Sequence, residues 1–262
     1  MYAEERQERV ERLIAASGRV AVVDLAREFD VTTETVRRDL TQLAHRGALR
    51  RVHGGAVAST VLGRAEESIA TRRDHNADAK ARIARAAMTL IPPTFSGAIA
   101  IDAGTTTGLL AEQIARWVPA DPRTSLVVVT NSVIVASIVS DNPDVEVQLL
   151  GGRVRGITSA AVGATTIAQL SRLRPDLAFI GANGLHAEFG LSTPDEEESA
   201  VKSALTRGAR RAVALVDASK LGKEALVRFA DLDELSALVT DADPGVALTA
   251  ALREAAVEVM VA

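Results

Sequence analysis

Apolar residues recur at helical spacing through the first 46 positions of the chain. The spacing predicts helices over residues 4–17, 22–30 and 33–46, with a glycine directly after the first and the third. A tight turn separates the second helix from the third, and the Thr32 hydroxyl can cap the third. The apolar residues that we expect to pack together are Val10, Leu13, Ile14, Leu25, Ala26, Phe29, Val36, Leu40 and Leu43.

Residues 49–58 alternate around the turn His53-Gly54-Gly55, a pattern typical of a β-hairpin. Helix, short helix, turn, helix and hairpin is the order of a winged helix-turn-helix. Residues 59–76 show no clear periodicity. We therefore expect a winged helix-turn-helix DNA-binding domain over residues 1–58 and a linker over residues 59–76.

Beyond the linker, a helix is predicted over residues 77–90, and apolar runs then alternate with amphipathic helices. Runs that are apolar throughout are buried on both faces, so we expect a mostly parallel, helix-covered sheet in an α/β domain over residues 77–262. The predicted strands are 98–102, 126–130, 145–150, 177–181, 211–217, 237–241 and 257–261. Helices are predicted between them, over 107–118, 132–140 and 195–208.

The composition excludes several classes of protein. The 262 residues are 47% hydrophobic, enough for two packed domains, yet the chain holds no apolar run long enough to span a membrane. The charged N-terminal segment lacks the apolar region of a secretory signal. The absence of cysteine excludes disulfides and cysteine-ligated metals, and His75 and His186 have no partner at metal-ligand spacing. We expect a cytoplasmic protein with no membrane association, no metal and no cofactor.

The net charge of −4 argues against a nucleic-acid partner, but the charge is unevenly distributed. Residues 32–53 hold five arginines against two acidic residues, whereas residues 59–262 hold 20 basic against 25 acidic residues. In a helix-turn-helix, the second helix lies in the major groove, where arginine reads guanine and threonine contacts phosphate or a thymine methyl. The residues that we expect to contact DNA, on this helix and on the hairpin, are Thr33, Thr35, Arg37, Arg38, Arg50, Arg51 and His53.

A second group of polar residues follows five of the predicted strands. Ligands of an open parallel sheet bind beyond the carboxyl ends of its strands. Threonine hydroxyls and helix N-terminal amides there offer donors to phosphate, and the whole mixture of donors and charges matches a sugar phosphate. The strand-end segments are 102–107, 130–131, 151–153, 181–184 and 217–220.

Each of these features also has a purely structural interpretation. An isolated arginine pair beside Asp39 would simply lie on a solvated helix face. A tight turn explains the Gly-Thr-Thr-Thr segment, and a bend in the chain explains Gly151-Gly152. Glu198 and Lys202 stand four residues apart, so a surface ion pair along one helix explains both. The prediction of a ligand site therefore depends on the occurrence of suitable polar residues at all five strand ends.

The motifs carry a family resemblance. VVDLAREFDVTTETVRRDL and LRRVHGGAVA resemble the DNA-binding domain of the DeoR/GlpR family of bacterial transcription regulators. IDAGTTT, VVTNS, LLGGRVR, FIGANG, GLSTPDEEESAVKSAL and DASKLG are similar to the family's effector-sensing domain, whose fold is shared with ribose-5-phosphate isomerase, glucosamine-phosphate deaminase and CoA-transferase subunits. The resemblance implies an effector-binding role for Asp102, Gly104, Thr105, Thr106, Thr107, Asn131, Gly152, Arg153, Asn183, Lys202, Asp217 and Lys220. Ala182 departs from the threonine of many relatives, which puts the effector preference in doubt.

The resemblance implies a repressor, bound to double-stranded operator DNA as a homodimer or homotetramer and released by a phosphorylated sugar. MYAEER and RGITSAAVG are most similar to an actinobacterial branch that controls fructose and sugar-phosphotransferase genes, which implies fructose 1-phosphate or fructose 6-phosphate. One alternative is a sugar-phosphate isomerase or deaminase with a regulatory DNA-binding domain, because Asp102, Glu198, Lys202 and Lys220 could supply an acid and a base. Another is a DNA-binding activator or architectural protein without a ligand.

Overall fold

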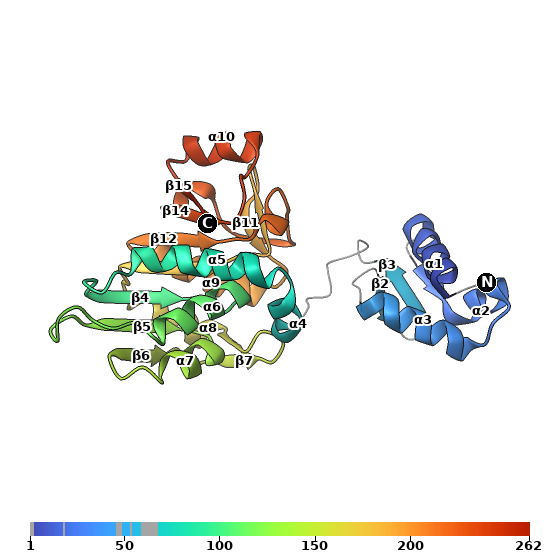
Figure 1. Cartoon of the computed structure of the whole chain (residues 1–262), viewed down its shortest axis with the longest axis horizontal. Coiled ribbons are helices and arrows are strands. Elements are labelled where there is room, and N and C mark those ends of the chain that lie inside the picture. Colours follow the sequence, from blue (N-terminus) through green and yellow to red (C-terminus); the bar gives the residue numbers. More distant parts are fainter. Residues whose placement is uncertain (1–2, 18, 46–48, 53, 59–67) are drawn as a thin grey trace. The chain divides into compact units, whose positions relative to one another are not determined.

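The computed structural model describes residues 3–17, 19–45, 49–52, 54–58 and 68–262. The chain divides into two compact units, residues 1–66 and 67–262 (Figure 1). Each unit has its own hydrophobic core.

The N-terminal unit is a winged helix-turn-helix, as predicted. Its elements are α1 (Ala3–Ser17), β1 (Arg19–Ala21), α2 (Val22–Phe29), α3 (Thr33–His45), β2 (Leu49–Val52) and β3 (Gly55–Ala58). The hairpin β2–β3 gains a third strand, β1, which pairs antiparallel with β3. Three residues are too few to show alternation, so the sequence pattern did not predict β1.

The predicted apolar positions form the core of this unit. Val36, Leu40 and Leu43 of α3 are fully buried against α1 and α2, while Leu13 and Phe29 are partly buried at its margin. The Thr32 hydroxyl accepts a hydrogen bond from the Thr35 amide at 3.2 Å, which confirms the predicted cap of α3. This packing leaves the opposite face of α3 in solvent.

All seven predicted strands lie in one sheet of the C-terminal unit, and every pairing in that sheet is parallel. The strands are β4 (Gly97–Ile101), β5 (Leu126–Thr130), β6 (Val145–Leu149), β9 (Leu177–Gly181), β12 (Arg211–Leu215), β14 (Ala237–Thr240) and β15 (Glu258–Val261). Their order is β15-β14-β12-β9-β4-β5-β6. Because all strands run the same way, their carboxyl ends meet along one edge of the sheet.

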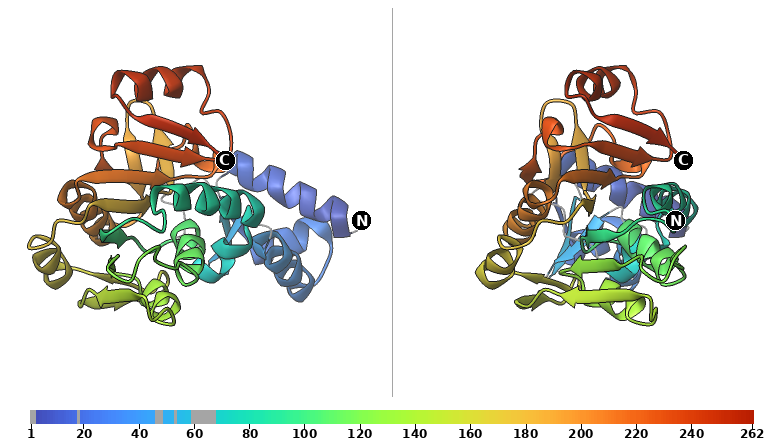
Figure 2. Two further views of the ribbon diagram at one scale, coloured as in Figure 1. Left: turned by 60° about the vertical axis from the view of Figure 1, so that its left-hand side comes forward. Right: turned by 90° about the vertical axis from the view of Figure 1, so that its left-hand side faces the viewer.

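Helices cover both faces of this sheet (Figure 2). On one face, α5 (Ala77–Ala87), α6 (Thr105–Ile114) and α7 (Val133–Val139) pack over β4 and β5. On the other, α8 (Ala164–Leu170) and α9 (Glu196–Gly208) pack over β9 and β12, and α10 (Val246–Glu254) joins the same core. No helix in the described part of the chain is long and apolar enough to cross a membrane.

Shorter elements outside the main sheet were not predicted. They are α4 (Ile69–Asp74), the hairpin β7 (Arg153–Arg155) and β8 (Ala160–Val162), the antiparallel sheet β10 (Gly184–His186), β11 (Gly190–Thr193) and β13 (Val227–Ala230), and the 3-10 turns η2 (Ala218–Lys220) and η3 (Leu232–Glu234). The helix predicted over residues 77–90 is α5, continued by the 3-10 turn η1 (Met88–Leu90). The helix α4 occupies residues that the aperiodic pattern assigned to a linker. It has only six residues, too few for a periodic stripe, and Ser68 caps it through the Thr71 amide at 3.2 Å.

Candidate functional site

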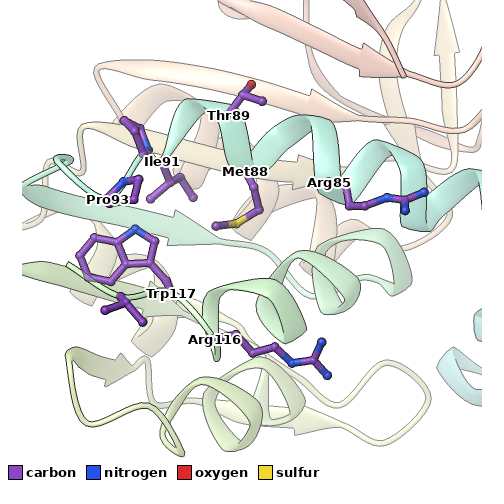
Figure 3. Close-up of a pocket in the computed structure, with 9 residues that line it drawn as sticks. Arg85, Met88, Thr89, Ile91, Pro93, Arg116 and Trp117 are labelled. Carbon is purple, nitrogen blue, oxygen red and sulfur yellow. The ribbon is translucent and has the colours of Figure 1, made fainter. Parts of the chain in front are cut away.

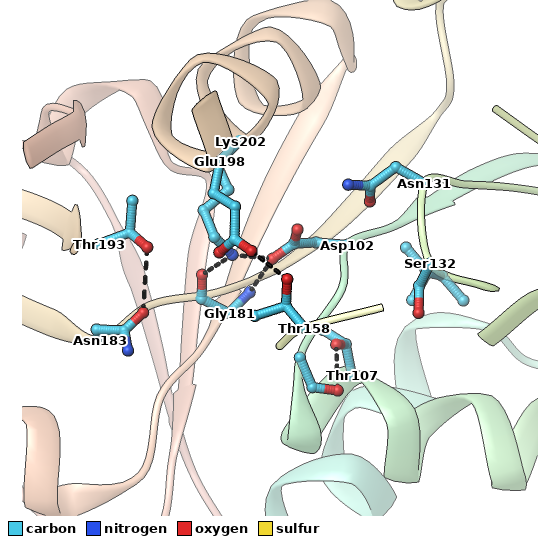
Figure 4. A network of polar contacts seen from close by, with 12 residues as sticks. Asp102, Thr107, Asn131, Ser132, Thr158, Gly181, Asn183, Thr193, Glu198 and Lys202 are labelled. Atoms are coloured by element: carbon cyan, nitrogen blue, oxygen red, sulfur yellow. Dashed lines mark hydrogen bonds and ion pairs between the residues drawn. The ribbon is translucent and has the colours of Figure 1, made fainter. Parts of the chain in front are cut away.

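The carboxyl edge of the seven-stranded sheet brings together several of the predicted effector residues, among them Asp102, Asn131, Asn183 and Lys202 (Figure 4). Asp102 directly follows β4 and Asn131 directly follows β5. Asn183 comes two residues after β9, and Asp217 comes two residues after β12. These side chains come from segments up to 115 positions apart in the sequence, and the parallel topology aligns them along one edge.

A buried ion pair lies at the centre of this edge. Asp102 Oδ2 pairs with Lys202 Nζ and accepts a hydrogen bond from the Gly181 amide at 3.2 Å. Lys202 Nζ also donates to the Gly181 carbonyl at 2.9 Å and lies 5.7 Å from the centre of the Phe229 ring. Burial raises the pKa of Asp102, and the positive charge of Lys202 opposes this rise without cancelling it.

The helical spacing predicted a surface ion pair between Glu198 and Lys202, and this prediction is wrong. Lys202 turns to Asp102, while Glu198 accepts from the Thr158 hydroxyl and from Arg155 Nη1 at 2.5 Å. Both side chains of α9 are buried, so each binds a partner from another element. The Glu198 contacts fasten the β7–β8 hairpin and its turn to α9.

A second charged group surrounds Asp217. Its Oδ1 accepts from the Ser219 amide at 3.1 Å, from the Ser219 hydroxyl at 2.5 Å and from Asn76 Nδ2 at 3.1 Å, and its Oδ2 lies 3.4 Å from Lys220 Nζ. Burial raises the pKa of Asp217, but the Lys220 charge and these hydrogen bonds outweigh it, so the pKa lies below its ordinary value. Burial lowers the pKa of Lys220, against the attraction of Asp217, and the nearby Arg72 charge lowers it further.

Arg72 and Asn76 are site residues that the sequence did not indicate. Both belong to the segment interpreted as a linker, where no strand end or motif marked them. Arg72 lies on α4, close enough to Lys220 to perturb its pKa, and Asn76 immediately precedes α5. The usable signal was weak: an Arg-Arg pair and an asparagine in a segment without periodicity.

The Gly-Thr-Thr-Thr segment forms the start of α6 beside Asp102. Gly104 is the residue before the helix, and Thr105, Thr106 and Thr107 form its first turn. The Thr107 hydroxyl donates to the Gly104 carbonyl at 3.1 Å, so it closes the turn locally. The first-turn amides of a helix lack intrahelical acceptors, which leaves donors for an anion at this edge.

The remaining predicted effector residues divide into two pairs. Asn131 Nδ2 donates to the Ala161 carbonyl at 3.1 Å, and Asn183 Oδ1 accepts from the Thr193 hydroxyl at 3.2 Å, which fixes both amides at the edge. Gly152 and Arg153 are exposed: Arg153 pairs with Glu197, and a side chain on Gly152 would collide with Thr166. The described contacts of Gly152 and Arg153 are therefore with residues other than those of the Asp102 and Asp217 groups.

Buried polar atoms without a hydrogen-bond partner concentrate at the same edge. In the described chain these atoms are Arg72 Nε, Asn131 Oδ1, Asp217 Oδ2, Thr240 Oγ1 and Trp117 Nε1. Thr240 is the last residue of β14, and Asn131 and Asp217 follow β5 and β12, so three of these atoms lie at strand carboxyl ends; Asp217 Oδ2 also lies 3.4 Å from Lys220 Nζ. Such atoms carry a desolvation cost that a bound ligand relieves. The described residues contain no group of three or more acidic, histidine or cysteine side chains that could hold a metal ion.

A separate surface groove of about 510 Å³ lies at the opposite, N-terminal edge of the strands (Figure 3). Met88, Ile91, Trp117 and neighbouring prolines give it a mainly apolar lining, with arginines at positions 85 and 116. Its position before β4 and after α6 separates it from the Asp102 and Asp217 groups. The charged donors and acceptors suited to a sugar phosphate are at the carboxyl edge instead.

The exposed face of α3 carries the predicted DNA-contacting side chains. Thr33, Arg37 and Arg38 are exposed, and Arg37 Nη1 lies 3.3 Å from Glu34. The Thr35 hydroxyl is 2.9 Å from that of Thr32, so it also completes the cap. Arg50 and Arg51 lie on β2 of the wing, but their side chains, and His53 entirely, fall outside the described residues.

Two family models match the chain. The DeoR-like helix-turn-helix domain matches residues 6–61, and the DeoR C-terminal sensor domain matches residues 75–242. The HTH-type transcriptional regulator GlpR of Haloferax volcanii is 37% identical, over 92% of this chain and 91% of its own length. The lactose phosphotransferase system repressor of Streptococcus mutans is 34% identical, over 92% and 93%.

Further similarity extends along the full chain. The HTH-type transcriptional repressor GlcR of Bacillus subtilis is 31% identical over 100% of this chain and 97% of its own length. Among solved structures, ribose 5-phosphate isomerase A of Methanocaldococcus jannaschii has a TM-score of 0.41 at 17% identity. That similarity covers 55% of this chain and 54% of the isomerase.

Proposed function

Because the chain belongs to the DeoR family of transcriptional regulators, we propose that it is a cytoplasmic repressor of genes for sugar uptake or catabolism. It binds operator DNA as a homodimer or homotetramer through α3 and the wing. A phosphorylated sugar, fructose 1-phosphate or a related compound, occupies the carboxyl edge of the seven-stranded sheet and releases the protein from DNA. The relatives from Streptococcus mutans and Bacillus subtilis described above are named as repressors, the first of a lactose phosphotransferase system.

The observation that carries the effector site is the concentration of unsatisfied buried polar atoms at this edge. Asn131 Oδ1 is an acceptor that a sugar hydroxyl can satisfy, and Arg72 Nε is a donor for phosphate. Lys220 and the first-turn amides of α6 add further attraction for an anion. A phosphorylated polyol supplies both the hydroxyl donors and the negative charge.

Assembly from several copies follows from the size of the DNA-reading surface. A single recognition helix contacts too few base pairs for useful discrimination, whereas two helices on adjacent half-sites supply it. Release requires that the effector bind the DNA-incompetent state more tightly, and a coupling of about 1–3 kcal/mol changes operator affinity roughly 5- to 150-fold.

An electrophoretic mobility shift on the DNA upstream of the protein's own gene tests the proposal. Full-length protein is expected to retard this DNA, and fructose 1-phosphate or fructose 6-phosphate is expected to release it, while unphosphorylated fructose is not. Retardation that no phosphorylated sugar reverses would overturn the effector assignment. Chromatography of the same samples shows whether the sugar phosphate is converted, and steady turnover would favour the enzyme alternative.

The DNA-reading role of α3 predicts a selective loss of operator affinity. Arg38→Ala is expected to weaken operator binding by about 1–3 kcal/mol with little change in thermal unfolding, because the side chain is exposed. Fluorescence anisotropy with labelled operator DNA measures this loss. Arg12→Ala, at an exposed arginine of α1, is the matched control, and equal losses in the two variants would contradict the role of α3.

The effector role of Lys220 predicts a repressor that no longer responds. Lys220→Ala is expected to keep operator affinity but to weaken effector binding roughly 10- to 150-fold, since a charge-assisted hydrogen bond contributes about 1.5–3 kcal/mol. Effector titrations of the preformed DNA complex measure the change. Lys223→Ala removes an exposed lysine from the same loop and should respond as the unmodified protein does. A normal response of Lys220→Ala would show that the effector shell is misplaced.

A further inference from the structure

The segment 68–76 joins the candidate effector site to the chain that leads into the N-terminal unit. Three contacts fasten this segment, which includes helix α4, to the rest of the C-terminal unit. The Ile69 amide donates to the Ile157 carbonyl at 2.9 Å, and Arg73 pairs with Glu112 of α6 at 2.6 Å. Asn76 Nδ2 donates to Asp217 Oδ1 at 3.1 Å.

Asn76 makes this contact at the expense of its local role. An asparagine before a helix normally accepts a hydrogen bond from an amide of the first turn. Asn76 makes no such side-chain cap for α5, and its backbone is left-handed, with φ 55° and ψ 37°. The side chain is instead directed across 141 positions of sequence to a buried carboxylate. The long-range contact therefore helps to hold the left-handed junction between α4 and α5.

Asp217 is also the residue at which an anionic ligand would disturb existing contacts. Its Oδ1 already accepts from Asn76 and from both donors of Ser219, and its Oδ2 faces Lys220. A sugar hydroxyl that donates to Asp217 Oδ1 competes with Asn76 Nδ2 and with the two Ser219 donors for this oxygen. Occupation of the site and retention of the Asn76 contact are thus in competition.

We propose that the hydrogen bond from Asn76 to Asp217 couples the effector site to DNA binding: it holds α4 in the operator-binding arrangement, and the bound phosphorylated sugar breaks it. This rests on the proposed function, whose effector site it shares. Lys80, a buried residue of α5, donates from Nζ to the Arg72 carbonyl at 2.5 Å, so a change at the junction is carried into α4.

The test is Asn76→Gly in the full-length protein. Glycine adopts the left-handed backbone of position 76 without strain, so the variant removes the amide side chain and little else. Operator affinity without effector is expected to fall about tenfold, within the usual range of allosteric coupling, and the effector should bind more tightly. The further release that the effector causes should shrink by the same factor, because coupling is reciprocal.

Asp74→Ala is the matched control, since it changes an exposed side chain at the end of α4 and leaves the contacts of Ile69, Arg73 and Asn76 in place. Hydrogen exchange over residues 68–76 gives a second readout: fructose 1-phosphate should raise exchange in the unmodified protein to the level of Asn76→Gly. If the unmodified protein responds to the effector and Asn76→Gly shows the same operator affinity and the same response, the coupling role is overturned. Tight operator binding with loss of effector binding would overturn it too, because Asn76 would then only position the ligand. If the unmodified protein itself binds no sugar phosphate, the proposed function fails instead.

Discussion

Asp39→Ala is expected to remove a large part of the stability of the N-terminal unit and to weaken operator binding. Asp39 is buried within α3 and accepts from Arg6 Nε at 2.5 Å and from Arg6 Nη2 at 3.1 Å, with Gln7 Nε2 at 3.3 Å. Removing one member of a buried ion pair costs about 3–5 kcal/mol. A unit of 66 residues has a free energy of unfolding of only about 3–10 kcal/mol. Circular dichroism during thermal unfolding, together with anisotropy on operator DNA, measures both consequences.

The double variant Arg6→Met/Asp39→Leu separates stability from DNA recognition. Replacing both members of a buried ion pair by apolar residues of similar volume is often neutral or stabilising. The double variant is therefore expected to recover most of the lost stability and of the operator binding. If it stays as unstable as Asp39→Ala, the ion pair is not the reason for the loss.

Lys202→Met is expected to destabilise the C-terminal unit by a comparable amount, about 3–5 kcal/mol at neutral pH. The change leaves the buried Asp102 carboxylate without its cation, at the centre of the sheet's carboxyl edge. Denaturant unfolding of the full-length protein, followed by circular dichroism, measures the loss. Asp102→Leu/Lys202→Met is the matched control: it should fold nearly as well as the unmodified protein and yet fail to respond to the effector.

The pH dependence of this destabilisation follows from the pKa of Asp102. Burial already raises that pKa, and loss of Lys202 removes the charge that opposes the rise. A carboxyl whose pKa is higher in the folded state binds protons on folding, so it favours folding at low pH and loses this contribution as pH rises through the folded pKa. The deficit of Lys202→Met should therefore shrink between pH 7 and pH 5. A deficit independent of pH would contradict the assignment to Asp102.

The parallel sheet was predictable because its strands are marked locally. Most of the seven runs are apolar along almost their whole length and end in polar or glycine residues, and the observed boundaries differ by at most two residues. The strands β1, β10 and β11 have three or four residues, so their pairing depends on distant partners that local alternation does not reveal. The helix α4 was likewise not predictable, because its six residues are too few to show a helical repeat of apolar positions.

The candidate site was predictable where chemistry coincides with a strand end. Asp102 and Asp217 are the last residues of predicted strands, Lys220 follows three residues after the second, and the topology brings them to one edge. The partners of charged residues were not predictable. Glu198 and Lys202 have the spacing of a helical ion pair, yet burial directs each to a residue 40 or more positions away. Spacing along a helix predicts ion pairs between exposed side chains. A buried side chain pairs instead with a group on another element that packs against it.

The separate cores of the two units have an evolutionary consequence. The nine buried residues that pack the N-terminal unit include none of the residues that pack the C-terminal unit. Substitutions that change the preferred operator can therefore accumulate on α3 without altering the packing around Asp102 and Asp217. Conversely, a lineage can acquire a new inducer while the target genes stay the same. Because the cores are independent, the preferred operator and the preferred effector can change separately, each through substitutions in one unit.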